Sequence, residues 1–107
     1  MLELNIKNFG DEVTGYDGFA LVEFWGEECE PCKKLMPVFE DLENKLSQNI
    51  KMCKLNITQN RKLAISQRVM TLPTVVLYKN GERIDKAHGP DASEAGIITM
   101  LERNLTI

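Results

Sequence analysis

Apolar residues in the first half of the chain follow the periods of strands and helices in turn. Residues 2–6 alternate apolar with polar side chains, which predicts a short strand, and a brief helix is expected over residues 9–16. Residues 19–25 are almost continuously apolar, as in a strand that is covered on both faces. A long amphipathic helix is predicted over residues 32–47. Its apolar side is formed by Leu35, Val38, Phe39, Leu42 and Leu46.

The middle of the chain continues the alternation of strands and helices. Residues 50–57 are mostly apolar and predict a third strand. Thr58 is a residue type that caps helices, so a helix is expected from there to about Val69. Pro73 then opens a further strand over residues 74–78.

The last part of the chain contains a hairpin signal and a helix signal. Asn80-Gly81 predicts a tight turn, so residues 82–87 should return antiparallel to the preceding strand. Asp91 and Glu94 have the spacing of a capping box for a final helix. The resulting order, βαβαβαββα, predicts an α/β fold with a central mixed sheet and helices on both faces. We expect a single domain over residues 1–107.

Composition and charge narrow the class of protein. The chain has 107 residues, of which 43% are hydrophobic and 27% charged, enough for one compact core. The net charge of -3 comes from interspersed charges without a basic block, so no nucleic acid partner is expected. We find neither the pattern of a signal peptide nor an apolar stretch of membrane-spanning length, and the cysteine count of 3 is odd. These features predict a cytoplasmic protein without a membrane partner.

The sequence Cys29-Glu30-Pro31-Cys32 carries the clearest chemical signal. It follows the apolar strand 19–25 and stands where the long helix begins. Two cysteines at this spacing can close a small disulfide ring, and the unpaired N–H groups of a helix N-terminus favour a thiolate. Proline is tolerated in a first helical turn because the missing N–H costs nothing there. The segment therefore predicts thiol–disulfide exchange.

These pieces together resemble the thioredoxin family over essentially the whole chain. The resemblance rests on Phe24-Trp25 before the two cysteines, Pro37 within the following helix, the segment 71–74, the hairpin at 80–81, and Gly89 before the last helix. A lone CxxC would be weak evidence, since zinc sites share it. Separate motifs at matching distances over a hundred residues are much more specific. The resemblance implies a thioredoxin-like fold.

The resemblance also implies an activity and a set of site residues. The chain would be a protein disulfide reductase in which Cys29 is the attacking thiolate and Cys32 the resolving thiol. Pro73 would match the family's cis-proline, whose loop offers the backbone of Leu72 to an extended substrate. The expected substrate-binding residues are Trp25, Glu28, Glu30, Pro31, Leu72, Pro73, Thr74 and Gly89. Glu28 and Glu30 depart from the family, which usually has tryptophan and glycine there, so two carboxylates flank the nucleophile.

Glu23 interrupts the most apolar strand of the chain. Burying an unpaired carboxylate costs several kcal/mol, so a function would explain its presence. The family has a buried aspartate at this position, which implies that Glu23 exchanges protons with Cys32. Lys54 matches a family lysine near that carboxylate and would tune its pKa. In the alternative, both side chains point to solvent.

Two further residues raise the question of a metal. Cys53 lies within a predicted strand, where a buried thiol usually acts as a small hydrophobic residue. Cys29, Cys32, Cys53 and His88 would formally make a zinc set, but Cys53 is expected inside the sheet and His88 at a hairpin end. We therefore expect no metal, and His88 is expected to be a surface residue.

The sequence predicts a protein disulfide oxidoreductase that obtains its electrons from another protein. No GxGxxG nucleotide-binding fingerprint is present, so a separate thioredoxin reductase is expected as partner and no cofactor beyond the Cys29–Cys32 disulfide. Other expected partners are client proteins that contain disulfides, and the chain is expected to be a monomer. The alternatives are a disulfide oxidase or isomerase, a glutaredoxin-like enzyme, a non-catalytic docking module, and a zinc-binding domain.

Overall fold

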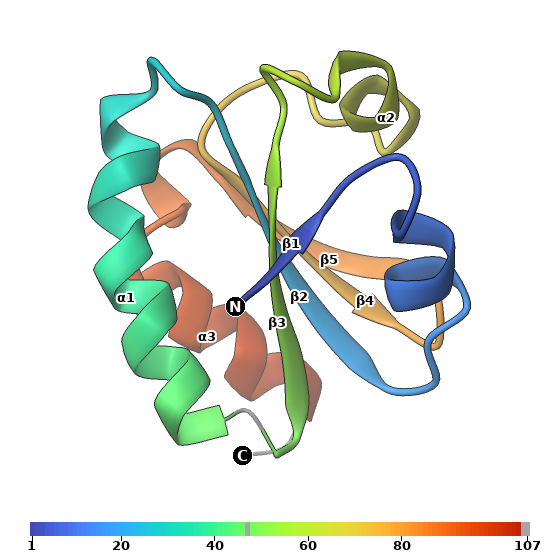
Figure 1. Ribbon diagram of the computed structural model, residues 1–107. Coiled ribbons are helices and arrows are strands. Elements are labelled where there is room, and N and C mark those ends of the chain that lie inside the picture. Colours follow the sequence, from blue (N-terminus) through green and yellow to red (C-terminus); the bar gives the residue numbers. More distant parts are fainter. Residues whose placement is uncertain (47, 106–107) are drawn as a thin grey trace.

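A five-stranded mixed sheet forms the centre of the molecule, as the computed structural model shows for residues 1–46 and 48–105 (Figure 1). The strands are β1 (Leu2–Leu4), β2 (Phe19–Trp25), β3 (Ile50–Asn56), β4 (Thr74–Lys79) and β5 (Glu82–His88). Their order across the sheet is β1-β3-β2-β4-β5. Because β2 pairs parallel with β3 and antiparallel with β4, it is the central strand.

Helices cover both faces of this sheet. Helices α1 (Glu30–Leu46) and α3 (Glu94–Leu105) lie against one face, and α2 (Arg61–Ser66) lies on the opposite side together with a π-helical turn, Gly10–Thr14 (Figure 1). The predicted mixed sheet with helices on both faces is confirmed. Among the helices of residues 1–46 and 48–105, none is long and apolar enough to cross a membrane.

The alternation of side chains along β2 supplies both cores. Leu21 packs with α1 and α3, in a cluster that includes Phe39 and Ile97. Val22 and Phe24 point to the other face, where they pack in a second cluster below α2 and the π-helical turn. Each such side chain contributes about 1.5–3 kcal/mol by leaving water. Burial on both faces explains why this strand is almost continuously apolar.

Several element boundaries differ from those predicted by the sequence. Strand β1 ends at Leu4, and Ile6, which would have extended the alternation, is 70% exposed. Helix α1 begins at Glu30, two residues before the predicted start. Its predicted last residue, Ser47, lies outside the described residues. The first turn of α1 therefore contains both the proline and the second cysteine of the CxxC segment.

The expected cap of α2 at Thr58 is wrong. This helix begins only at Arg61 and ends at Ser66. Thr58 Oγ1 instead accepts a hydrogen bond of 3.1 Å from the backbone N–H of Glu27, in the loop after β2. The hydroxyl thus joins two loops that are distant in sequence.

The hairpin at Asn80-Gly81 is confirmed, and it requires a glycine. Asn80 and Gly81 have φ values of 51° and 83°, the left-handed conformation of a tight hairpin turn. A Cβ at Gly81 would lie 2.0 Å from the carbonyl oxygen of Thr14, so no other residue fits there without a shift of the backbone.

The predicted capping box at Asp91 and Glu94 is wrong, because Asp91 belongs to a separate 3-10 turn, Gly89–Asp91. Helix α3 begins at Glu94, and the residue before it, Ser93, provides the cap. Its Oγ accepts a hydrogen bond of 3.1 Å from the backbone N–H of Gly96, three residues later.

This difference leads to a stability prediction. Ser93→Ala leaves the Gly96 N–H without its acceptor and should lower the free energy of unfolding by about 1 kcal/mol. Asp91→Ala, the matched control, should change it much less. Urea denaturation of both variants measures the two effects. A larger loss in Asp91→Ala than in Ser93→Ala would contradict the assignment of the cap.

Candidate active site

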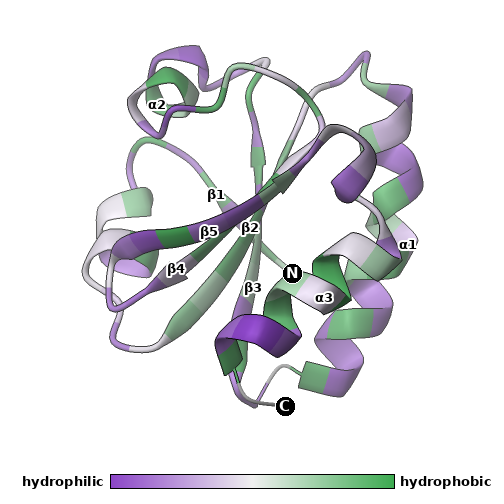
Figure 2. Ribbon diagram, turned by 180° about the vertical axis from the view of Figure 1, so that it is seen from behind, coloured by the Kyte–Doolittle hydropathy of each residue, from purple (hydrophilic) through white to green (hydrophobic). Residues whose placement is uncertain are grey.

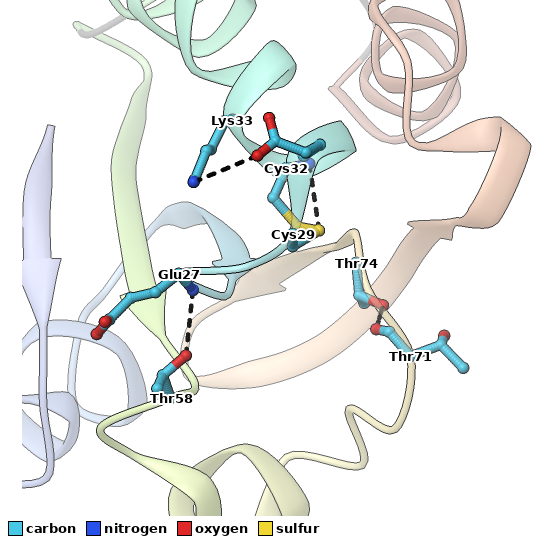
Figure 3. Close-up of a disulfide and its surroundings, with 8 residues drawn as sticks. Glu27, Cys29, Cys32, Lys33, Thr58, Thr71 and Thr74 are labelled. Carbon is cyan, nitrogen blue, oxygen red and sulfur yellow. Dashed lines mark hydrogen bonds and ion pairs between the residues drawn. A yellow bond between two sulfur atoms is a disulfide. The ribbon is translucent and has the colours of Figure 1, made fainter.

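The two cysteines of the CxxC segment lie at the junction between β2 and α1. Strand β2 ends at Trp25, a short loop follows, and α1 begins one residue after Cys29. Cys29 and Cys32 form a disulfide with a Cα–Cα distance of 5.3 Å (Figure 3). The dithiol is therefore held by the carboxyl end of the central strand and by the first turn of the longest helix.

The sulfur of Cys29 occupies the place of a helix cap. Cys29 precedes the first helical residue, Glu30, and its Sγ accepts a hydrogen bond of 3.3 Å from the backbone N–H of Cys32 (Figure 3). An N-terminal helix end offers unpaired N–H groups and a partial positive charge, and both favour a negative sulfur. Cys29 is half-buried, whereas Cys32 is fully buried. Only the first cysteine is thus open to a molecule approaching from outside.

The cis-proline loop lies close to the dithiol. The cis peptide bond implied for Pro73 is present between Leu72 and Pro73. A Cβ at Gly26 would lie 3.0 Å from Leu72 Cδ1 and 3.9 Å from Cys29 Cβ. The Leu72 side chain therefore packs against Gly26, close to Cys29. Thr74 Oγ1 donates a hydrogen bond of 2.6 Å to the carbonyl oxygen of Thr71, which closes the loop on itself (Figure 3).

The remaining expected docking residues flank this loop. Thr74 pairs with His88 across β4 and β5, which places Gly89 beside the start of β4. Trp25, at the end of β2, is half-buried, and its Nε1 is buried without a hydrogen-bond partner among the described residues. Pro31 is exposed in the first turn of α1.

Glu23 is the most unusual residue near the site, because it is 0% exposed. Neither carboxylate oxygen has a hydrogen-bond partner within residues 1–46 and 48–105. Lys54 is its neighbour across β2 and β3, as the resemblance implied, but the two are not hydrogen-bonded. Burial raises the pKa of Glu23 to about 7, and the positive charge of Lys54 opposes the rise. The alternative in which Glu23 points to solvent is wrong.

The carboxylates beside the nucleophile differ in their partners. Glu28 and Glu30 are both exposed. The Glu30 carboxylate lies 3.6 Å from the ammonium of Lys33, one turn along α1 (Figure 3). In water such an exposed pair contributes at most about 1 kcal/mol. The repulsion that Glu30 exerts on the thiolate is thus partly offset within the same turn.

A hydrogen-bonded clasp that the sequence did not reveal holds the loop before Cys29. Glu27 Oε2 accepts hydrogen bonds from Asn56 Nδ2 at 3.0 Å and from Gln59 Nε2 at 3.4 Å. The backbone N–H of Glu27 donates to Thr58, as described above. Asn56 Oδ1 in turn accepts from the Thr58 N–H at 2.9 Å. The loop after β3 therefore fixes the position of the loop that leads into the dithiol.

The cysteines and histidine that would formally make a zinc set lie in different places. Cys53 is 0% exposed and packs in the core below α2, and burial raises the pKa of its thiol to about 12. His88 is exposed at the end of β5. Within the described part of the chain, no three His, Cys, Asp or Glu side chains converge as metal ligands. Cys53 acts as a small apolar core residue.

The raised pKa of Glu23 leads to a prediction about stability. An unfolded glutamate has a pKa near 4.5, so between pH 4.5 and about 7 the unfolded chain loses a proton that the folded chain retains. Stability should fall across this range, by on the order of 3 kcal/mol. Glu23→Gln removes the titrating group, so the variant should match the wild type at pH 4 and exceed it in stability at pH 8. Urea denaturation at both values measures this, and equal pH dependence of the two proteins would contradict it.

Comparisons with known proteins agree with this geometry. The model of the Thioredoxin family matches residues 1–103. The chain is 40% identical to a thioredoxin of Acetoanaerobium sticklandii over 103 residues, which cover 96% of this chain and 98% of the other. It is 34% identical to a thioredoxin of Peptoclostridium acidaminophilum over 105 residues, covering 98% and 96%. The chain therefore belongs to the thioredoxin family and is a protein disulfide oxidoreductase with a redox-active CxxC disulfide.

Proposed function

We propose that the reduced protein attacks client disulfides through the Cys29 thiolate and that Cys32 completes the reduction. The observation that carries this assignment is the difference in exposure between the two sulfurs at one helix end. Cys29 is half-buried and sits at the cap position of α1, where N–H groups favour a thiolate. Cys32 is fully buried behind it. A client sulfur can reach the first cysteine, and only an intramolecular partner reaches the second.

The reaction has two displacements. The Cys29 thiolate attacks one sulfur of the client disulfide, and the other client sulfur leaves as a thiolate. Cys32, after losing its proton, attacks Cys29 Sγ, and the client's first sulfur leaves in turn. Two electrons pass to the client, whose sulfurs become thiols, and the Cys29–Cys32 disulfide forms. The Cα–Cα distance of 5.3 Å lies within the range in which a disulfide closes without backbone movement.

Glu23 is the proposed proton acceptor for Cys32. Both groups are fully buried. Glu23 is two residues after Leu21 in β2, so its side chain points to the same face of the sheet, the face that α1 covers. A carboxyl with a pKa of about 7 is half ionised at neutral pH, so it can both take up and return a proton. Lys54 supports the ionised form by its charge.

The surface around Cys29 is the proposed seat of the client. An extended segment would lie along the backbone of Leu72 and contact the residues around it. The proposed contacts are Trp25, Glu28, Glu30, Pro31, Pro73, Thr74 and Gly89. The support is the packing of Leu72 against Gly26 beside Cys29.

The redox chemistry of the chain also suggests a partner and a location. We propose that a separate thioredoxin reductase restores the dithiol and that the protein uses no cofactor beyond its own disulfide, because the sequence contains no GxGxxG nucleotide-binding fingerprint. The buried free thiol of Cys53 is compatible with a reducing compartment, and we propose the cytoplasm. We also propose that the protein is a monomer.

Reduction of insulin disulfides by dithiothreitol tests the role of Cys29. The wild type should accelerate precipitation of insulin, and Cys29→Ser should abolish the acceleration because the attacking thiolate is gone. Cys32→Ser should form a mixed disulfide that persists and can be isolated with its client. Cys53→Ala is the control and should keep the activity. Full activity of Cys29→Ser would refute the proposal.

The pH dependence of the second displacement tests the role of Glu23. With a chromogenic aryl disulfide, stopped-flow absorbance separates attack by Cys29 from resolution by Cys32. In the wild type the resolution rate should rise through about pH 7, and in Glu23→Gln it should lose this rise and fall about 10-fold or more at pH 7. Glu40→Gln, an exposed change on α1, is the control. Superimposable profiles for wild type and Glu23→Gln would rule out the proton transfer.

A further inference from the structure

The surface beside the cis-proline loop carries two adjoining hollows that share the same three cationic side chains. The hollows have volumes of about 400 Å³ and about 130 Å³. Arg68, Arg83 and Lys86 line both of them, and His88 lines the smaller one. We call these four residues the basic hollow.

Strand register explains why these cations gather on one side of the sheet. Arg83, Lys86 and His88 pair across the ladder with Tyr78, Val76 and Thr74, respectively. Opposite residues of an antiparallel pair point to the same face, and Tyr78 and Val76 belong to the core below α2. Strand β5 is an edge strand of the sheet and is mostly hydrophilic (Figure 2).

Arg68 completes the cluster from the end of α2. It follows the helix in a left-handed conformation, with φ of 60°, and its side chain is exposed. The guanidinium of Arg83 donates a hydrogen bond to the carbonyl oxygen of Gln67, the residue before Arg68. This bond fixes Arg83 beside Arg68 and ties β5 to the end of α2.

The charge of the basic hollow is not neutralised within the protein. Of the ion pairs formed by residues 1–46 and 48–105, none includes Arg68, Arg83 or Lys86. Asp85 also lines the larger hollow, but its carboxylate receives hydrogen bonds from Arg103 at 2.8 and 2.9 Å and from Asn104 at 2.7 Å. The chain as a whole has a net charge of -3, so the positive charge of this region is opposite in sign to the net charge of the protein.

The basic hollow borders the segment that carries the cis-proline. Met70 and Thr71, in the loop that carries the cis bond before Pro73, line the smaller hollow together with Thr74, the first residue of β4. Leu72 of the same loop packs beside Cys29. Glu27 lies on the other side of the dithiol from Thr71 (Figure 3), and both Glu27 and the next residue, Glu28, are exposed. The surface around the dithiol thus changes sign, from acidic before Cys29 to basic beyond Thr71.

We propose that the basic hollow binds an acidic segment of the client protein next to the disulfide being reduced. The inference rests on the disulfide exchange proposed above and specifies its substrate class. A client chain that extends from Cys29 along the cis-proline loop reaches the basic hollow, where Asp or Glu side chains meet Arg68 and Lys86. Basic residues at the same place would be repelled. Glu27 and Glu28 favour the same orientation, because they repel the acidic end from the opposite flank.

The size of the effect follows from the exposure of these charges. An exposed ion pair strengthens an association about 1.5- to 5-fold, so pairs with Arg68 and Lys86 together favour an acidic client over an uncharged one by about 5-fold. Charges at the rim of an interface act mainly on the association rate and weaken with salt. The preference should therefore appear in second-order rate constants and shrink at high ionic strength.

Three synthetic disulfide peptides test the proposal. They share one disulfide-bonded core and differ in the flanking residues, which are four Glu, four Lys or four Ser. The prereduced full chain is mixed with each peptide, and acid-quenched samples give the second-order rate constants. The wild type should reduce the Glu peptide about 10-fold faster than the Lys peptide at low salt, and 0.5 M NaCl should remove most of the difference.

Variants assign the preference to the basic hollow. Arg68→Gln with Lys86→Gln should lower the rate ratio of Glu to Ser peptide by about 5-fold, and Arg68→Glu with Lys86→Glu should invert the preference. Lys7→Gln with Lys45→Gln makes the same change in net charge at exposed positions outside the basic hollow and should keep the wild-type ratio. An unchanged ratio in the first pair, or a wild-type preference for the Lys peptide, overturns the proposal while disulfide exchange stands. No reaction of the wild type with the Ser peptide would overturn both.

Discussion

The whole arrangement depends on keeping the central strand β2 dry between two apolar layers. Its inner residues, from Ala20 to Phe24, are all buried, and hydrogen-bonded ladders run along both of its sides. The chain can leave such a strand only at its end. It does so after Trp25 and turns at once into α1, so the dithiol stands at the boundary between core and solvent. The asymmetry between an accessible Cys29 and a shielded Cys32 comes from this position.

Glu23 is the exception within that dry strand, and the exception connects stability with chemistry. A carboxylate without hydrogen bonds in an apolar layer is unfavourable when ionised, which is why its pKa is raised to about 7. An apolar residue would suit the packing better at this place. A group that exchanges protons near neutral pH can exist inside the protein only at such a cost. Lys54, beside it in the sheet, limits the cost without removing it.

The sequence allowed the fold to be predicted where one local rule determines the outcome. The apolar run of β2 and the left-handed turn at Asn80-Gly81 leave few alternatives, and both are present in the structure. The prediction of the α3 cap was wrong because Asp91 and Ser93 both carry oxygens that can accept a hydrogen bond. Only the packed structure decides which backbone N–H each oxygen meets. The prediction that Thr58 caps α2 was wrong for a related reason, since the partner of its hydroxyl is 31 residues away in the chain.

The candidate site was predictable to a similar degree. The CxxC segment and its position at a strand-to-helix junction follow from the residues, whereas the cis bond at Pro73 came only from the family resemblance. The clasp of Glu27 was missed because its partners lie 29 and 32 residues away. The one available signal was Asn56, a polar amide at the end of an otherwise apolar strand.

The burial of the third cysteine, Cys53, in the core determines which disulfide the folded chain can form. Three cysteines can pair in three ways, and two of these would lock a thiol of the reactive pair into an inactive bond. Cys53 packs in the core below α2, and its neighbours Val22 and Leu55 are in the same apolar cluster. Its sulfur has no contact with solvent, and a thiol with a pKa of about 12 is almost entirely protonated at neutral pH. The folded chain can therefore pass through repeated cycles of oxidation and reduction with a single available pairing of its sulfurs.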